Sequence, residues 1–255
     1  MPLGLGLGLG IGSGAIYPPA SSWPSVYDIP PGMLVLDADG VLKKKIKGFK
    51  NEGFDYLDTG RPSWIGALNP TESFTICTVL KIKKTAAIAQ YLLGLLQGDD
   101  TPSQQVSVFF HQGAKNVSMV IGGLAANASY ALPSVDTLLD ICITSNGLKS
   151  DLWINGASLI SGLTNGSFVT SQNLKIFGYA YNTAYNSEAI FFQSSIYSGY
   201  SSDGTKNGLS LIEKYDMDKW DGSTSGIGNN GTPYTIVKAT PFTEETYALV
   251  PVSML

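Results

Sequence analysis

Charged side chains are scarce in this 255-residue chain. Asp, Glu, Lys and Arg make up 14% of it, with a net charge of −4, whereas an average soluble domain has about a quarter of its residues charged. A protein that binds nucleic acid needs a basic footprint, so this partner class is excluded. One local exception is a basic segment, which we interpret as a solvated strand face or loop, with a contact to an acidic partner as the alternative. Its members are Lys43, Lys44, Lys45, Lys47 and Lys50.

Histidine and cysteine are equally rare. The single histidine, His111, follows an alternating apolar run, and no Gly-x-Ser-x-Gly motif accompanies it, so we expect a structural residue and no serine-type catalysis. One histidine and two cysteines do not make a zinc site. Cys77 and Cys142 each lie inside an apolar run, which favours two buried thiols; a single disulfide across a β-sandwich is the alternative.

No segment has the pattern of a membrane span. The opening residues 2–12 are apolar, but half of them are glycine and no basic residue precedes them. Glycine disfavours a helix, and the stretch is too short for a bilayer. We therefore expect neither a secretion signal nor a transmembrane segment.

Three zones divide the chain. Residues 1–32 form a Gly/Pro-rich extended N-terminal arm, because alternation of leucine with glycine places the apolar side chains on one face of an extended strand. Such a face buries nothing alone, so it predicts a partner: another protein, another copy of the chain or a groove on its own domain. A flexible tail without a role is the alternative. The proposed assembly residues are Leu3, Leu5, Leu7, Leu9 and Ile11.

Residues 33–216 form the body, and 217–255 a linker followed by a docking segment. Short apolar runs with period-two alternation, such as 74–79, recur through the body, and Asn-Gly turn signals separate them. This pattern predicts an all-β antiparallel sandwich or jelly roll. One helix is predicted at 209–215, and strands are predicted at 234–237 and 247–252 of the last zone.

The order of several motifs resembles the laminin-G/concanavalin-A-like lectin and glucanase superfamily. Asp151-Leu-Trp-Ile-Asn-Gly, Leu174-Lys-Ile-Phe-Gly and 190–197 follow one another as in its closing half, and 53–60 with 73–79 match the opening half. The compact Phe-x-Gly of that family is replaced by Ser187-Glu-Ala-Ile. The resemblance implies a concanavalin-A-like jelly-roll sandwich.

The same resemblance bears on catalysis and metals. Related glucanases carry Glu-x-Asp-x-x-Glu on one strand, and this pattern is absent here, so we expect no enzyme. Asp216, Asp218 and Asp221 are interpreted as a solvated segment after the predicted helix. Asp99 and Asp100 are weak calcium candidates, although a polar turn is preferred, and no cofactor is expected.

A loop rich in tyrosine and asparagine is the candidate surface for a glycan or receptor. Such a loop offers aromatic faces together with amides, as antibody loops do, while a polar loop with buried rings is the alternative. The site residues are Tyr179, Tyr181, Asn182, Tyr185 and Asn186.

The opening Leu-Gly repeat resembles those of phage and prophage structural proteins. This resemblance implies a non-enzymatic virion protein, such as a head fibre, decoration or tail component, anchored by its terminal arms and presenting a lectin-like sandwich for host attachment. Its partners would be other virion proteins, copies of itself and a host-surface glycan. The alternative is a secreted or cell-surface bacterial carbohydrate-binding module, and a glycan-active hydrolase is the third hypothesis.

Overall fold

The structure of the chain is a computed structural model. It describes residues 17–23, 25, 28–51, 56–69, 71–84, 90–97, 105–111, 115–131, 136–166, 174–176, 188–237 and 246–255.

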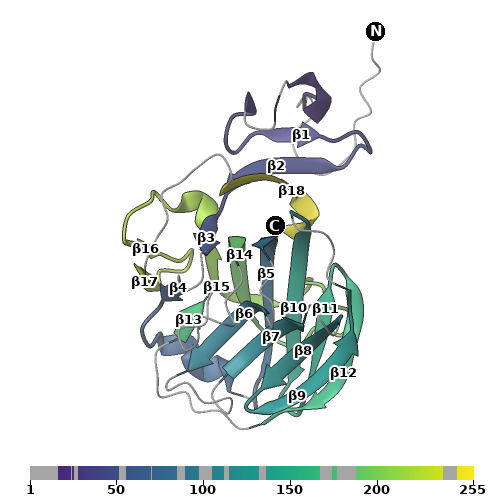
Figure 1. Ribbon diagram of the computed structural model, residues 1–255. Helices are drawn as coiled ribbons and strands as arrows, with labels where there is room; N and C mark the ends of the chain where they lie inside the picture. Colours follow the sequence, from purple (N-terminus) through teal and green to yellow (C-terminus); the bar gives the residue numbers. More distant parts are fainter. Residues whose placement is uncertain are drawn as a thin grey trace.

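Two large antiparallel sheets face each other, which confirms the predicted all-β sandwich (Figure 1). The first sheet has seven strands in the order β12-β11-β10-β5-β14-β15, with β3 also paired to β14. These strands are β3 (Phe49–Asn51), β5 (Ser73–Lys84), β10 (Leu138–Asn146), β11 (Lys149–Ile154), β12 (Ala157–Thr164), β14 (Glu188–Ser198) and β15 (Ser210–Asp216).

The second sheet has eight strands in the order β16-β17-β4-β13-β6-β7-β8-β9. They are β4 (Tyr56–Asp58), β6 (Gln90–Gln97), β7 (Gln105–His111), β8 (Asn116–Ile121), β9 (Leu124–Ser129), β13 (Leu174–Ile176), β16 (Ser225–Ile227) and β17 (Pro233–Val237).

The hydrophobic core fills the space between the two sheets. Ile76 of β5, Ile141 of β10 and Val108 of β7 are all fully buried in it. Because successive side chains of a strand point to opposite faces, Cys77 and Cys142 must point away from this core, onto the outer face of the seven-stranded sheet. That outer face carries the candidate site.

The Asn-Gly pairs make tight turns as expected. Asn155 and Gly156 both have positive φ, 50° and 76°, and join β11 to β12 as a two-residue hairpin loop. Asn146 ends β10, and Gly147 then turns the chain toward β11 with φ 86°.

The helix predicted at 209–215 is wrong, because this segment is the strand β15. Glu213 and Tyr215 are fully buried, and Lys214 between them is only partly buried. This is the period of a strand. Strand β14 also has a free edge that β15 completes, pairing Ser194 with Tyr215, and tertiary pairing of this kind overrides weak local spacing.

The stretch predicted as a linker after residue 216 contains ordered structure. The carboxylate of the buried Glu213 accepts backbone N–H bonds from Lys214 at 2.8 Å, Asn230 at 2.7 Å and Thr232 at 3.0 Å. These bonds fix the turn between β16 and β17. Strand β17 pairs with β4, so the strand predicted at 234–237 is confirmed, while the division of the chain into three zones stays a prediction.

A third, three-stranded sheet lies across one end of the sandwich (Figure 1). It consists of β1 (Leu34–Leu36), β2 (Leu42–Lys47) and β18 (Tyr247–Pro251), and β18 confirms the strand predicted at 247–252. A second buried cluster, which includes Val79, Phe192 and Val250, joins this sheet to the outer face of the seven-stranded sheet.

The basic segment contacts groups of the same chain. Lys43 pairs with Asp37 at 2.8 Å, Lys44 pairs with Asp218 at 3.0 Å, and the ammonium of Lys45 lies 5.2 Å from the centre of the Tyr247 ring. The first three lysines of the segment therefore lie on β2 with their charges met by groups of the same chain, while Lys50 lies on β3. The described residues also include no helix that is both long and apolar enough to cross a membrane.

Candidate functional site

Most of the site residues predicted from the sequence lie outside the described residues. Tyr179, Tyr181, Asn182, Tyr185 and Asn186 belong to the connection between β13 and β14. Asp99 and Asp100, and the arm residues Leu3, Leu5, Leu7, Leu9 and Ile11, also fall outside. These assignments stay predictions.

The remaining candidates give no metal site. Asp216 ends β15, and Asp218 lies in the short 3-10 helix η6 (Met217–Lys219) that follows. His111 is the last residue of β7. Within the described ranges, no group of three or more His, Cys, Asp and Glu residues gathers closely enough to hold a metal ion.

Cys77 and Cys142 form a disulfide, so the interpretation as two free thiols is wrong. They lie directly opposite each other on β5 and β10, with their Cα atoms 4.2 Å apart. Directly opposed residues in a closely spaced antiparallel pair bring their side chains together, and these two share the outer face. The bridge therefore lies within one sheet and does not cross the sandwich.

The disulfide is the centre of a row of side chains across four strands. Trp153 of β11 lies opposite Cys142, and Ser195 of β14 lies opposite Cys77. The row therefore runs Trp153, Cys142, Cys77, Ser195 over the outer face. It places an indole ring beside a buried disulfide.

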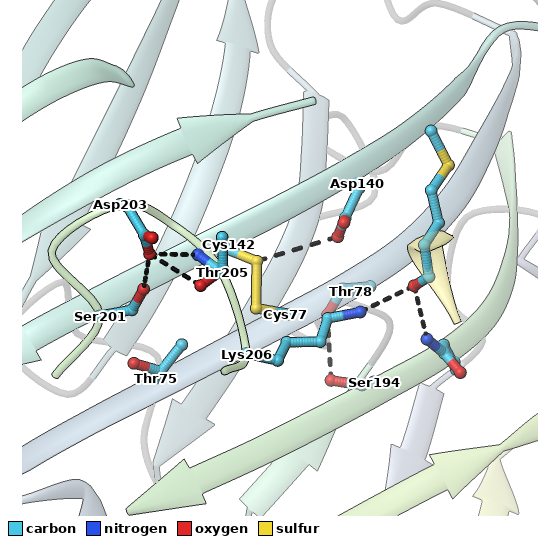
Figure 2. Close-up of a disulfide and its surroundings, with 12 residues drawn as sticks. Thr75, Cys77, Thr78, Asp140, Cys142, Ser194, Ser201, Asp203, Thr205 and Lys206 are labelled. Carbon is cyan, nitrogen blue, oxygen red and sulfur yellow. Dashed lines mark hydrogen bonds between the residues drawn. A yellow bond between two sulfur atoms is a disulfide. The ribbon is translucent and has the colours of Figure 1, made fainter. Parts of the chain in front are cut away.

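A polar loop between β14 and β15 folds over this row (Figure 2). One carboxylate oxygen of Asp203 accepts three hydrogen bonds, from the Ser201 hydroxyl at 3.0 Å and from the backbone N–H and hydroxyl of Thr205 at 3.0 and 2.8 Å. The bonds to Thr205, followed by that to Ser201, lower the pKa of Asp203. The loop is thus preorganised by its own side chains.

A cavity of about 330 Å³ lies between this loop and the sheet. Asp140 and Cys142 of β10 and Trp153 of β11 line its floor, Gly156 borders it from the hairpin turn, and Ser253 from the C-terminal segment. The loop contributes Asp203, Gly204, Thr205, Lys206 and Asn207.

Two opposite charges meet in the cavity. Burial raises the pKa of Asp140, and the charge of Lys206 opposes this rise. Burial likewise lowers the pKa of Lys206, and Asp140 opposes that fall. The ammonium of Lys206 donates a hydrogen bond to the carbonyl oxygen of Met254 at 2.7 Å, so the cation is drawn toward the C-terminal segment (Figure 2).

Two polar groups of the cavity lack partners among the described residues. The nearest polar contact of the Asp140 carboxylate is the Cys142 sulfur at 3.8 Å, and a disulfide sulfur carries no hydrogen to donate. The indole N–H of Trp153 is buried and has no acceptor. The Asp140 side chain is only partly buried, so a ligand that enters the cavity can supply the hydrogen-bond donor that this carboxylate lacks.

The lining of the cavity contains no histidine and no free thiol, and its Thr205 hydroxyl donates to the Asp203 carboxylate. Sequence reasoning used Trp153 only as a mark of the fold, and it passed over Asp140 and Lys206. The polar run from Ser201 to Asn207 between two strands was the signal available.

A second, larger cavity of about 670 Å³ lies at β4, β16 and β17, lined by residues such as Asp58, Ile227 and Thr235. One aromatic residue, Tyr234, lines it; this ring is 5% exposed and packs edge-on against Tyr215. Burial raises the pKa of Tyr234 to about 12. The Tyr234 ring is therefore almost fully covered, whereas Trp153 in the smaller cavity is only partly buried, so the cavity beside Trp153 is the stronger candidate.

No protein-family model matches the chain, and no curated protein matches it. Its fold is similar to several solved structures. They include a sialidase from Trypanosoma rangeli, with TM-score 0.44 and 12% identity over 69% of this chain and 26% of that one. This chain therefore spans about a quarter of that sialidase.

Two smaller structures are matched over most of their length. The CBM40 of a Ruminococcus gnavus IT-sialidase has TM-score 0.47 and 14% identity, covering 62% of this chain and 94% of that one. The carbohydrate binding module CBM66 from Bacillus subtilis has TM-score 0.35 and 12% identity, covering 63% of this chain and 88% of that one. These likenesses concern the β-sandwich fold alone.

Proposed function

We propose that the chain is a non-enzymatic carbohydrate-binding module whose site is the cavity beside Trp153. The observation that carries the proposal is the combination of an indole ring and a carboxylate without a hydrogen-bond donor in one cavity. Sugars present apolar C–H faces and rings of hydroxyl donors. An aromatic wall with a few fixed polar groups complements both.

The size and rigidity of the cavity support a small ligand. Its volume of about 330 Å³ is at the lower end of ordinary ligand sites. The disulfide holds the strands beneath the cavity, and the Asp203 hydrogen bonds hold the loop above it. The protein therefore loses little conformational entropy when a ligand binds. The proposal is carried by the cavity and not by the low structural likenesses.

A secreted or cell-surface location accompanies this proposal. Disulfides persist in oxidising compartments and are rare in the cytosol. The Cys77–Cys142 bridge therefore supports the extracellular alternative considered for the sequence.

The test is a glycan array followed by calorimetry of the best ligand. We expect Trp153→Ala to abolish binding, while Leu148→Ala, at a side chain 77% exposed in the turn after β10, retains it. Circular dichroism of both variants checks that the fold is intact, and Trp153→Phe, which keeps an aromatic ring, should bind with intermediate affinity. Binding unchanged in Trp153→Ala, or an array without any ligand, would refute the proposal.

The absence of catalysis is tested with the same ligand. We expect the bound glycan to be recovered intact after prolonged incubation with the protein, as chromatography of the released sugars would show. Turnover that disappears in Trp153→Ala would instead identify a hydrolase.

The virion attachment function stays a prediction, because it depends on residues 3–11, outside the described part of the chain. Size-exclusion chromatography of the full chain and of a chain without residues 1–16 tests it. Assembly of the full chain alone would favour a virion component, and two soluble monomers would exclude this use of the arm.

A further inference from the structure

The charges around the cavity are unequal. Among its lining residues, Asp140 and Asp203 are acidic, and Lys206 is basic. The single cation already binds the Met254 carbonyl oxygen. Negative charges therefore outnumber positive charges on the lining.

The two carboxylates differ in what they still accept. Asp203 uses one oxygen for Ser201 and Thr205, and its second oxygen has no donor among the described residues. Asp140 has no N–H or O–H donor on either oxygen in the same residues. A ligand that brings hydroxyl hydrogens satisfies both groups, because an ionised carboxylate can only accept.

A ligand with its own carboxylate would be repelled by the carboxylates of the cavity. It would bring a third negative charge beside Asp140 and Asp203, in a site where burial already disfavours the charge of Asp140,. Proteins usually hold carboxylates with the two-pronged guanidinium of arginine. The chain has one arginine, Arg61, and it is not among the residues that line this cavity.

We propose that the cavity selects uncharged sugars, with Asp140 accepting hydrogen bonds from ligand hydroxyls, and rejects sugar acids. This inference rests on the proposed carbohydrate-binding function and adds the ligand class. Asp140 is the residue that determines specificity, and Trp153 supplies the apolar wall that every sugar would use. The selectivity comes from electrostatic repulsion as much as from attraction.

The experiment is calorimetric titration with matched pairs of methyl glycosides: glucose and glucuronic acid, and galactose and galacturonic acid, with sialic acid added. We expect the neutral member of at least one pair to bind, and its acid to bind about tenfold more weakly or not at all. In Asp140→Asn, the neutral sugar should lose about tenfold in affinity or more, because a charged acceptor is removed. The difference in affinity between the neutral sugar and its acid should become smaller in the same variant.

The control is Asp39→Asn, at an exposed turn before β2, which should leave both affinities unchanged. A sugar acid that binds as tightly as its neutral partner, and loses binding in Trp153→Ala, overturns the selectivity but leaves the carbohydrate-binding function intact. If none of the sugars and no array glycan binds, the proposed function fails, and the selectivity fails with it.

Discussion

Gly204 packs closely against the side chain of Trp153. A Cβ added at this glycine would lie 2.6 Å from the ring atom Cγ and 2.7 Å from Cδ2, which is far inside van der Waals contact. The loop over the cavity can approach the sheet this closely only because residue 204 has no side chain. The same residue has φ +73°, a conformation that glycine adopts without strain.

The first prediction concerns this contact. We expect Gly204→Ala to displace the loop, to lower the free energy of unfolding by about 1–2 kcal/mol or more, and to weaken sugar binding. Gly208→Ala is the matched control: it has φ +75°, but nothing lies within 4 Å of its added Cβ. Urea unfolding and calorimetry of both variants separate backbone strain from the clash, and equal sugar affinities in the two would contradict a role for the contact.

The second prediction concerns the disulfide, which closes a sequence separation of 65 residues. Replacing both cysteines by alanine should lower the free energy of unfolding by about 2–4 kcal/mol, since the bridge restricts the unfolded chain. Denaturant unfolding with and without a reducing agent measures this. The double variant should be insensitive to the reducing agent, and a wild-type protein with the same insensitivity would show that the bridge does not form.

The third prediction concerns Glu213, which is fully buried and accepts three backbone N–H groups. Glu213→Gln should cost about 1–3 kcal/mol of stability, because an amide replaces an oxygen acceptor and leaves a backbone donor without its partner. Glu72→Gln, at an exposed position, should be nearly neutral. Sugar affinity should stay unchanged in both, because neither residue lines the cavity, and thermal unfolding compares their stabilities.

The fourth prediction is a pH dependence of sugar binding. Burial raises the pKa of Asp140 above its ordinary 3.8, so this carboxylate takes up a proton at a higher pH than an exposed aspartate. Ligand hydroxyls donate stronger hydrogen bonds to the ionised carboxylate than to the protonated acid. Affinity should therefore be full above the pKa of Asp140 and fall as the pH drops through it. The loss should begin at a higher pH than an ordinary aspartate would give.

The neighbouring titratable groups keep their charge in the pH range where Asp140 takes up a proton. Asp203 has a lowered pKa and stays ionised, while Tyr197, whose pKa is raised mainly by burial, stays neutral. Lys206 has a lowered pKa, so its charge changes on the alkaline side. Calorimetry across the acidic range should show a sloping profile in the wild type and a flat one in Asp140→Asn; a slope that persists in the variant would assign the titration to another group.

Sequence patterns over a few neighbouring residues predicted many of the β-strands and turns correctly. The alternation at 74–79 indicated a strand with one buried face. The strand β5 does bury Phe74 and Ile76 against the core, but Cys77 and Val79 on its opposite face are buried as well. The Asn-Gly pair at 155–156 made the hairpin that its positive φ angles allow. These features depend on near neighbours, and the sequence displays near neighbours directly.

The prediction from such patterns failed for the segment 209–215. Leu209, Ile212 and Tyr215 have helical spacing, but the fully buried side chains are Glu213 and Tyr215. Burial of Glu213 depends on the amides of Asn230 and Thr232, which follow in a later turn. A buried carboxylate of this kind gives no local signal.

By itself, the sequence determined the all-β class and the position of most strands that it predicted, because period-two alternation expresses burial one strand at a time. Only the tertiary structure decided that Cys77 and Cys142 bond within one sheet, and that Asp140, Trp153 and Lys206 line one cavity. These residues come from β10, β11 and the loop before β15, and strand order and register, which depend on contacts distant in the chain, bring them together.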